Sequence, residues 1–168
     1  FQMGFGNFLR TPERASRVGF SDALWRSSSR LVSTPETLRK FQSGSSQELN
    51  LETLANARVA TITASQQHRY LEQIAPQRGL TIVTLTTPAE VFEALREQTA
   101  DFALVVGLSA YMYIKAEDPQ LRRFSYVGAG ITEHNLGGSV HIALPLSAHA
   151  LRRDVNRAIA DMRNDGTY

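Results

Sequence analysis

Arg14 is the first residue in this chain whose position suggests chemistry, because it lies among residues typical of a helix start. Thr11 suits the N-cap, Pro12 suits the first helical position, where no N–H is needed, and Glu13 suits the positive end of the helix dipole. A guanidinium beside free backbone N–H groups can bind a carboxylate or another anion. The alternative is a surface arginine that pairs within its own helix, and the spacing leaves both open.

A second polar stretch, Thr63–Gln67, lies between an expected strand and an expected helix, with Ser65 at the N-cap. It offers hydroxyl, amide and backbone N–H donors to an anion or a polar ligand. Its alternative interpretation is ordinary helix capping. Because Arg14 and Ser65 fall in different parts of the chain, two helix starts could close on one small ligand.

Other site chemistries find little support in the residues. The histidines are His68, His134, His141 and His149. No two of them have the i,i+4 spacing of a metal-binding helix, and the chain has no cysteine for metal, thiol or disulfide chemistry. A nucleophile elbow, a dinucleotide fingerprint and a P-loop are also missing from the sequence. We therefore expect no metal, no cofactor and no catalytic triad.

Composition indicates a soluble globular protein of 168 residues, with 42% hydrophobic and 20% charged residues. The 18 basic residues are spread along the chain against 16 acidic ones, so nucleic acid binding is disfavoured. No apolar run approaches the ~18 residues of a membrane span, and no signal peptide is visible. The apolar start at Phe1 resembles the middle of a buried strand, so we expect that an N-terminal portion is missing.

The middle of the chain alternates between strand and helix patterns. Strands are expected over residues 57–63, 80–84, 101–106 and 124–127. Helices are expected after Ser65, after the capping box that starts at Thr87, and from Ser109 to Asp118. This alternation predicts an α/β fold with a parallel sheet, whose site would lie at the carboxyl ends of the strands.

Two polar or glycine-rich segments, at roughly residues 33–50 and 128–138, bracket this block. A chain that leaves one lobe, builds a second and returns has two such crossings, which is the layout of a hinge. We therefore assign residues 1–33 and 138–168 to one lobe and residues 34–137 to the other. In the first lobe a strand is expected over 140–144, followed by a long helix capped by Ser147.

Several segments resemble bacterial periplasmic solute-binding proteins of the polar amino-acid type. The similar segments, in the order of the family, are Thr11–Arg14 with Val18–Asp22, Thr86–Leu95 with Ala100–Ala103, and Leu151–Tyr168 with its Asp-Gly-Thr-Tyr end. Together they span nearly the whole chain. The resemblance implies a two-lobed, periplasmic-binding-protein-like fold that closes on a ligand. It also implies that about two βα units of the first lobe are absent from this chain.

The resemblance also implies a ligand site. Arg14 falls on the arginine that pairs with the α-carboxylate of the ligand, and Asn7 and Leu9 fall on two further contact positions of the first lobe. Leu9 replaces the usual Ser or Thr, so only its backbone would contribute. Ser65 and Gln66 fall on the helix start of the second lobe that holds the carboxylate from the other side.

Val106 occupies the position of the family's acidic residue, which meets the α-ammonium of an amino acid. A buried ammonium without a counter-charge is costly. A carboxylate-bearing, otherwise anionic or neutral ligand therefore fits this chain better than an α-amino acid.

The leading hypothesis is a non-enzymatic, periplasmic or otherwise extracytoplasmic binding domain that serves an ABC permease or a membrane sensor. A second hypothesis is a dehydratase-like enzyme on the same scaffold, with Glu133 or His134 as the general acid. A third is a ligand-free regulatory module within a larger protein.

Overall fold

The computed structural model describes residues 2–43, 48–118, 120 and 122–167, and the chain divides into two compact units. The first unit combines Phe1–Ser27 with Gly137–Tyr168, and the second is Ser28–Leu136. The chain therefore enters the second unit after Ser27 and leaves it after Leu136. The crossing expected over residues 33–50 lies instead within the second unit.

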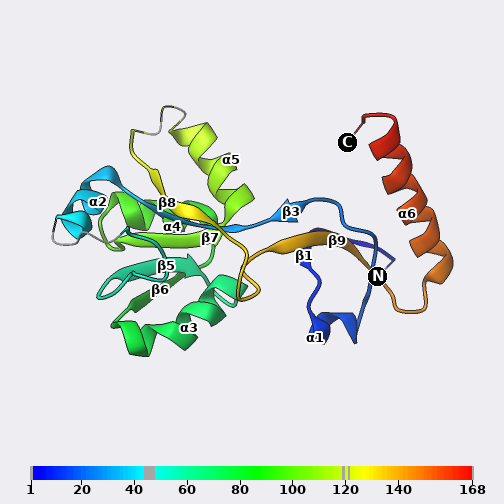
Figure 1. The fold of residues 1–168 in the computed structure, drawn as a ribbon, viewed down its shortest axis with the longest axis horizontal. Coiled ribbons are helices and arrows are strands. Elements are labelled where there is room, and N and C mark those ends of the chain that lie inside the picture. Colours follow the sequence, from blue (N-terminus) through cyan, green and yellow to red (C-terminus); the bar gives the residue numbers. More distant parts are fainter. Residues whose placement is uncertain (1, 44–47, 119, 121, 168) are drawn as a thin grey trace. The chain divides into compact units, whose positions relative to one another are not determined.

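The second unit is built on a five-stranded sheet (Figure 1). The strands, in sheet order, are β6 (Thr81–Leu85), β5 (Arg58–Ile62), β7 (Phe102–Val106), β4 (Ser29–Ser33) and β8 (Ser125–Ile131). Strand β5 is parallel to β6 and β7, whereas β4 is antiparallel to both β7 and β8. The prediction of an α/β fold is confirmed, but the sheet is mixed, because β4 is inserted antiparallel between β7 and β8, which are parallel to each other.

Three helices follow the parallel strands. They are α3 (Gln66–Arg78), α4 (Pro88–Arg96) and α5 (Gly107–Glu117). The capping box of α4 forms as predicted, and Gly79 ends α3 in the left-handed conformation, although α3 continues through Pro76. Helix α5 begins two residues before the predicted Ser109, and the N–H of Gly107, which has no partner inside the helix, donates to the carbonyl of Ser28 at 2.7 Å.

Alternating residues of the strands supply two hydrophobic cores, one on each face of the sheet. Leu31 and Leu104 pack with Leu71 of α3 in one core. Val32 and Val105 pack with helices α4 and α5 in the other, where the ring of Phe92 stacks on Tyr113 at 4.2 Å. The helices thus cover both faces of the sheet, as expected for an α/β layer structure.

Helix α2 (Pro35–Gln42) lies in a segment predicted to be a loop. Its start has the same chemistry as that of α4, since Thr34 caps it and Pro35 takes the first position. Phe41 packs edge-on against Phe102 at 5.0 Å, which anchors the helix to the sheet. The loop prediction was wrong over Pro35–Gln42 because a Ser-Thr-Pro sequence can start a helix as well as break one. Residues 44–47, which were also predicted to form a loop, lie outside the described residues.

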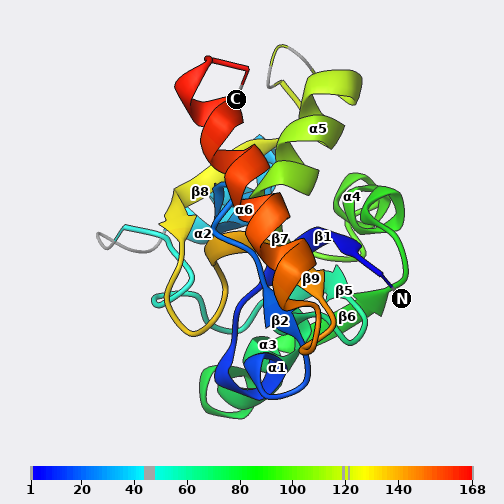
Figure 2. The same cartoon turned by 90° about the vertical axis from the view of Figure 1, so that its right-hand side faces the viewer.

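The first unit is organised around β9 (Gly138–Leu144), which pairs antiparallel with three short segments. These are β1 (Gly4–Leu9), β2 (Gly19–Phe20) and β3 (Arg26–Ser27). Figure 2 shows β2 beside β9 in this unit. Helix α1 (Pro12–Ala15) follows β1, and α6 (His149–Asn164) follows β9. The N-cap of α6 is Ala148 rather than the predicted Ser147, because a turn closed by the Ala148 N–H and the Pro145 carbonyl precedes the helix.

Candidate functional site

The residues predicted to hold a ligand in the second unit meet at one edge of its sheet. Strands β5 and β7 are parallel neighbours, so their carboxyl ends, followed by Ser65 and by Gly107, share that edge. Strand β4 runs the other way and places Ser29 opposite Val106. Ser65, Gln66 and Val106 are therefore brought together at the sheet edge where α/β proteins bind ligands.

Ser65 forms the N-cap of α3. Its hydroxyl oxygen accepts the N–H of His68 at 3.1 Å, and the N–H of Ala64 donates to Nδ1 of the same histidine at 3.2 Å. The first N–H groups of a helix have no partner inside it. The start of α3 therefore carries ordinary capping, and in addition it presents a hydroxyl proton and backbone donors suited to an anion.

Gln66 lines a cavity of about 260 Å³. His134, which lies between β8 and β9, lines the same cavity. The imidazole of His134 stacks on the ring of Tyr70, with centroids 4.9 Å apart and an interplanar angle of 19°.

Glu133, the other residue of the enzyme hypothesis, is exposed, and its carboxylate accepts hydrogen bonds from the N–H and the hydroxyl of Thr132 at 3.1 and 3.2 Å. Its own backbone N–H and these Thr132 donors hold the pKa of Glu133 below its usual value. A general acid needs the opposite shift, so Glu133 is poorly suited to that role.

Gln67 is a site-adjacent residue that sequence reasoning missed. Its amide, only 6% exposed, donates to the hydroxyl of Ser29 at 2.8 Å, and that hydroxyl donates to the carbonyl of Leu136 at 2.5 Å. The first turn of α3 is thereby tied to the start of β4 and to the last residue of the unit. No local pattern could have indicated this, because the three residues come from distant parts of the sequence.

Arg30 of β4 is a second residue that the sequence analysis did not select. Its guanidinium lies over the ring of Tyr126, 4.5 Å from the centroid, on the strand next to β7. A Cβ at Gly107 would lie 3.2 Å from its Cγ, and one at Gly130 would lie 3.4 Å from its Nη1. These two glycines leave room for the arginine beside the start of α5.

Arg30 pairs with Val105, so its side chain lies at the same end of the strands as Val106 but on the other face of the sheet. Val106 is half-buried and, as N-cap of α5, makes no side-chain hydrogen bond to that helix. The positive charge of Arg30 at this end of the strands favours a carboxylate over an ammonium group, because like charges repel. Burial raises the pKa of Tyr126, and the positive charge of Arg30 opposes that rise.

In the first unit, Arg14 donates from Nη1 to the carbonyl of Leu9 at 3.2 Å, and its N–H donates to the hydroxyl of Thr11 at 3.2 Å. Within the described part of the chain, no ion pair involves Arg14; Glu13 lies 4.0 Å from Arg17 instead. The guanidinium is thus fixed at one nitrogen and keeps other donors for a ligand. Asn7 lies in β1, and its side chain falls outside the description.

Two kinds of feature are absent from the part of the chain that the structure describes. No group of three or more His, Cys, Asp or Glu side chains there has the arrangement of a metal site. None of its helices is long and apolar enough to span a membrane.

The chain is similar in sequence to a periplasmic binding protein, although no family model matches it. The lysine/arginine/ornithine-binding periplasmic protein of Escherichia coli (strain K12) is 24% identical over 160 residues. That alignment covers 94% of this chain and 58% of the relative, so the chain spans little more than half the length of the curated relatives it matches.

Solved structures give the fold. An ancestral arginine-binding protein bound to arginine superposes with a TM-score of 0.78 at 22% identity, covering 99% of this chain and 68% of that one. An ancestral amino-acid-binding protein, described as a precursor of cyclohexadienyl dehydratase, gives 0.75 at 21% identity, with 100% and 65% covered. The predicted resemblance and the two-lobed, periplasmic-binding-protein-like α/β fold are confirmed.

Proposed function

We propose that this chain binds a small, carboxylate-bearing solute outside the cytoplasm, with Arg14 of the first unit as the carboxylate partner and the α3 start of the second unit as a further source of donors. The observation that supports the proposal most strongly is the hydrogen bonding of the Arg14 guanidinium. Its guanidinium is held by the Leu9 carbonyl, and among the described residues no carboxylate neutralises it. A half-buried arginine that is positioned but unneutralised is suited to bind a carboxylate of a ligand.

Ser65 and Gln66 supply donors from the second unit, and Arg30 adds a positive charge at the carboxyl end of β7. This set disfavours the α-ammonium of an amino acid, which would need a carboxylate there. The proposed ligand class is therefore a mono- or dicarboxylate without a free ammonium group, ahead of the amino acids named for the relatives.

The proposed setting follows the relatives, which are named as periplasmic binding proteins. The partner would be an ABC permease or a membrane sensor that recognises the ligand-closed form. Fractionation of the native cell, with immunoblots of periplasmic extract, tests the location. Recovery of the protein only with the cytoplasmic fraction would contradict it.

Calorimetric titration with a panel of carboxylates, neutral polar solutes and amino acids tests the function. We expect saturable binding of at least one carboxylate and weaker binding of its α-amino counterpart. Tighter binding of the amino acid would reverse the proposed ligand class, and failure of every solute would remove the function.

An enzyme is the second candidate, favoured only by the similarity to the dehydratase precursor. The lowered pKa of Glu133 argues against its use as a general acid, which leaves His134, stacked on Tyr70. A screen of cyclic carboxylic acids for dehydration tests this candidate. Turnover that is lost in His134→Ala would support it, and turnover that does not depend on His134 would count against this site.

A further inference from the structure

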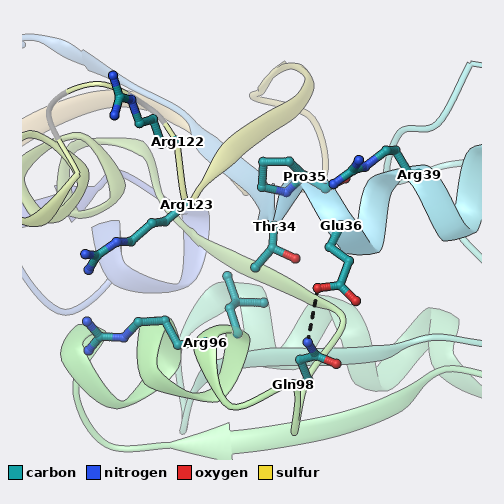
Figure 3. A pocket seen from close by; sticks show the side chains of 9 residues that line it. Thr34, Pro35, Glu36, Arg39, Arg96, Gln98, Arg122 and Arg123 are labelled. Carbon is teal, nitrogen blue, oxygen red and sulfur yellow. Dashed lines mark hydrogen bonds between the residues drawn. The ribbon is translucent and has the colours of Figure 1, made fainter.

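A second cavity in the second unit lies at the opposite edge of the sheet from Val106. Its volume is about 310 Å³. It opens where β4 ends and β7 and β8 begin, since Ser33 pairs with both Phe102 and Ser125. The described lining consists of Thr34, Pro35, Glu36, Arg39, Leu95, Arg96, Gln98, Arg122 and Arg123 (Figure 3). Because it is separated from Ser65 and Val106 by the length of the strands, this cavity is independent of the proposed solute site.

The lining is strongly basic. Arg39, Arg96, Arg122 and Arg123 surround the space, and Glu36 is the one carboxylate in the described lining. The charge of Glu36 is already compensated, because its carboxylate lies 2.8 Å from the Lys40 ammonium and also accepts from Gln98 at 3.4 Å. The cavity therefore concentrates positive charge in a protein whose net charge is only +2.

Two of the arginines differ from the others in their side-chain contacts within the described residues, although the charge of Arg123 also acts on Asp118. Arg96 binds Glu93 and the Tyr113 hydroxyl, and Arg39 donates to the Pro35 carbonyl at 3.3 Å. By contrast, the side chains of Arg122 and Arg123 make no hydrogen bond or ion pair with another described residue. In Figure 3 the guanidinium of Arg123 extends toward that of Arg96, whereas the side chain of Arg122 points away from them.

The backbone that carries these two arginines is fixed by a buried carboxylate. Asp118, 5% exposed, accepts the N–H groups of Arg122, Arg123 and Phe124 at 3.0, 2.7 and 2.9 Å. The two side chains are thus presented from an anchored turn, which reduces the cost of ordering them around a ligand.

From this arrangement we propose that the cavity binds a small multivalent oxyanion, of the phosphate or polycarboxylate class. Guanidinium groups form forked, charge-assisted hydrogen bonds with such oxygens. The volume suits a small ligand, and no aromatic side chain is found in the described lining on which a nucleobase would stack. The ligand is therefore a compact anion.

Titration of the whole chain with pyrophosphate, and separately with citrate, at low ionic strength tests the proposal. We expect saturable binding of at least one probe. The double variant Arg122→Ala/Arg123→Ala should lower the affinity by about tenfold or more, through the lost charge-assisted hydrogen bonds. The probe that binds more tightly assigns the phosphate or the polycarboxylate class.

Arg152→Ala/Arg153→Ala is the matched control, since it removes the same charge from adjacent arginines of α6 in the first unit. It should leave pyrophosphate binding unchanged, and so should Arg14→Ala, which separates this site from the proposed solute site. Circular dichroism should show equal unfolding midpoints for both double variants. Equal losses in both double variants, or no binding of either probe, would overturn the proposal. Binding of an acidic peptide but of neither small anion would also overturn it, in favour of a protein partner.

Discussion

The amide of Gln67 donates to the hydroxyl of Ser29 at 2.8 Å inside the second unit, where both side chains are buried. Ser29 in turn donates to the Leu136 carbonyl, so one hydroxyl joins a helix start, a strand start and the last residue of the unit. Because water does not reach these groups, each depends on the others for its hydrogen bonds. These buried hydrogen bonds therefore fix the position of the helix start that carries Ser65 and Gln66.

Ser29→Ala should destabilise the protein by about 1–3 kcal/mol, because it leaves the Gln67 amide and the Leu136 carbonyl unsatisfied. Urea unfolding followed by circular dichroism measures this. The exposed Gln73→Ala on the same helix is the control and should change the unfolding free energy by less than about 0.5 kcal/mol. A Ser29→Ala variant as stable as the wild type would show that the network does not contribute.

Gly107→Ala should also destabilise the protein, since the added Cβ would lie 2.9 Å from the Ser28 carbonyl and 3.2 Å from Arg30 Cγ. Overpacking of this kind typically costs about 1–3 kcal/mol. At Gly19 the nearest atoms would be at 3.4 Å, so Gly19→Ala serves as the control with ordinary contacts. Unfolding of the two variants at the same urea concentration would contradict the close approach of the Ser28 carbonyl to Gly107.

Asp118 should make stability depend on acid pH. Burial alone would raise its pKa, but the N–H groups of Arg123, Phe124 and Arg122 hold the pKa below its ordinary value. A carboxyl whose pKa is lower in the folded state stabilises the protein above its unfolded pKa, about 3.9, and that contribution is lost as the pH falls through the folded value.

Asp118→Asn should therefore cost about 1–3 kcal/mol at pH 7, because an amide nitrogen cannot accept a backbone N–H. The difference from the wild type should shrink as the pH falls below about 4. Urea unfolding at several pH values measures it, with the exposed Asp161→Asn as control. A difference that stays constant down to pH 2 would contradict this role of Asp118.

Arg30 should set the charge preference of the solute site. Arg30→Ala should weaken binding of the best carboxylate by about tenfold, the size of a lost charge-assisted contact. Val106→Asp combined with Arg30→Ala should move the preference toward the α-amino counterpart, because it restores a carboxylate beside the ligand. Calorimetry on both ligands measures the ratio, and an unchanged ratio would exclude Arg30 from the site.

The local signals in the sequence were sufficient for most of the second unit. Capping residues at Ser65 and Thr87 and the β-branched runs predicted α3, α4 and the parallel strands, since these depend on neighbouring residues. The same local logic was wrong at Thr34-Pro35, which starts a helix in a segment predicted as a loop. It also could not reveal that β4 pairs antiparallel with β7, because strand pairing depends on distant residues.

The candidate site shows the same limit. Arg14, Ser65 and Gln66 were selected because each lies at a recognisable helix start. Arg30 and Gln67 were missed because their importance depends on Tyr126, Ser29 and two glycines elsewhere in the chain. Packing across the sheet, rather than any sequence motif, brings Arg30 and Gln67 to the carboxyl ends of β5 and β7.

The affinity of the Arg14→Ala variant for the best carboxylate, measured by calorimetry beside Arg17→Ala, tests the central claim most directly. Arg17 lies just after the same helix turn and pairs with Glu13, so it is the matched control. We predict a loss of about tenfold to several hundredfold for Arg14→Ala, as expected when one charged hydrogen-bonding partner of a ligand is removed, and no change for Arg17→Ala. Equal affinity of Arg14→Ala and the wild type would contradict the proposed carboxylate site.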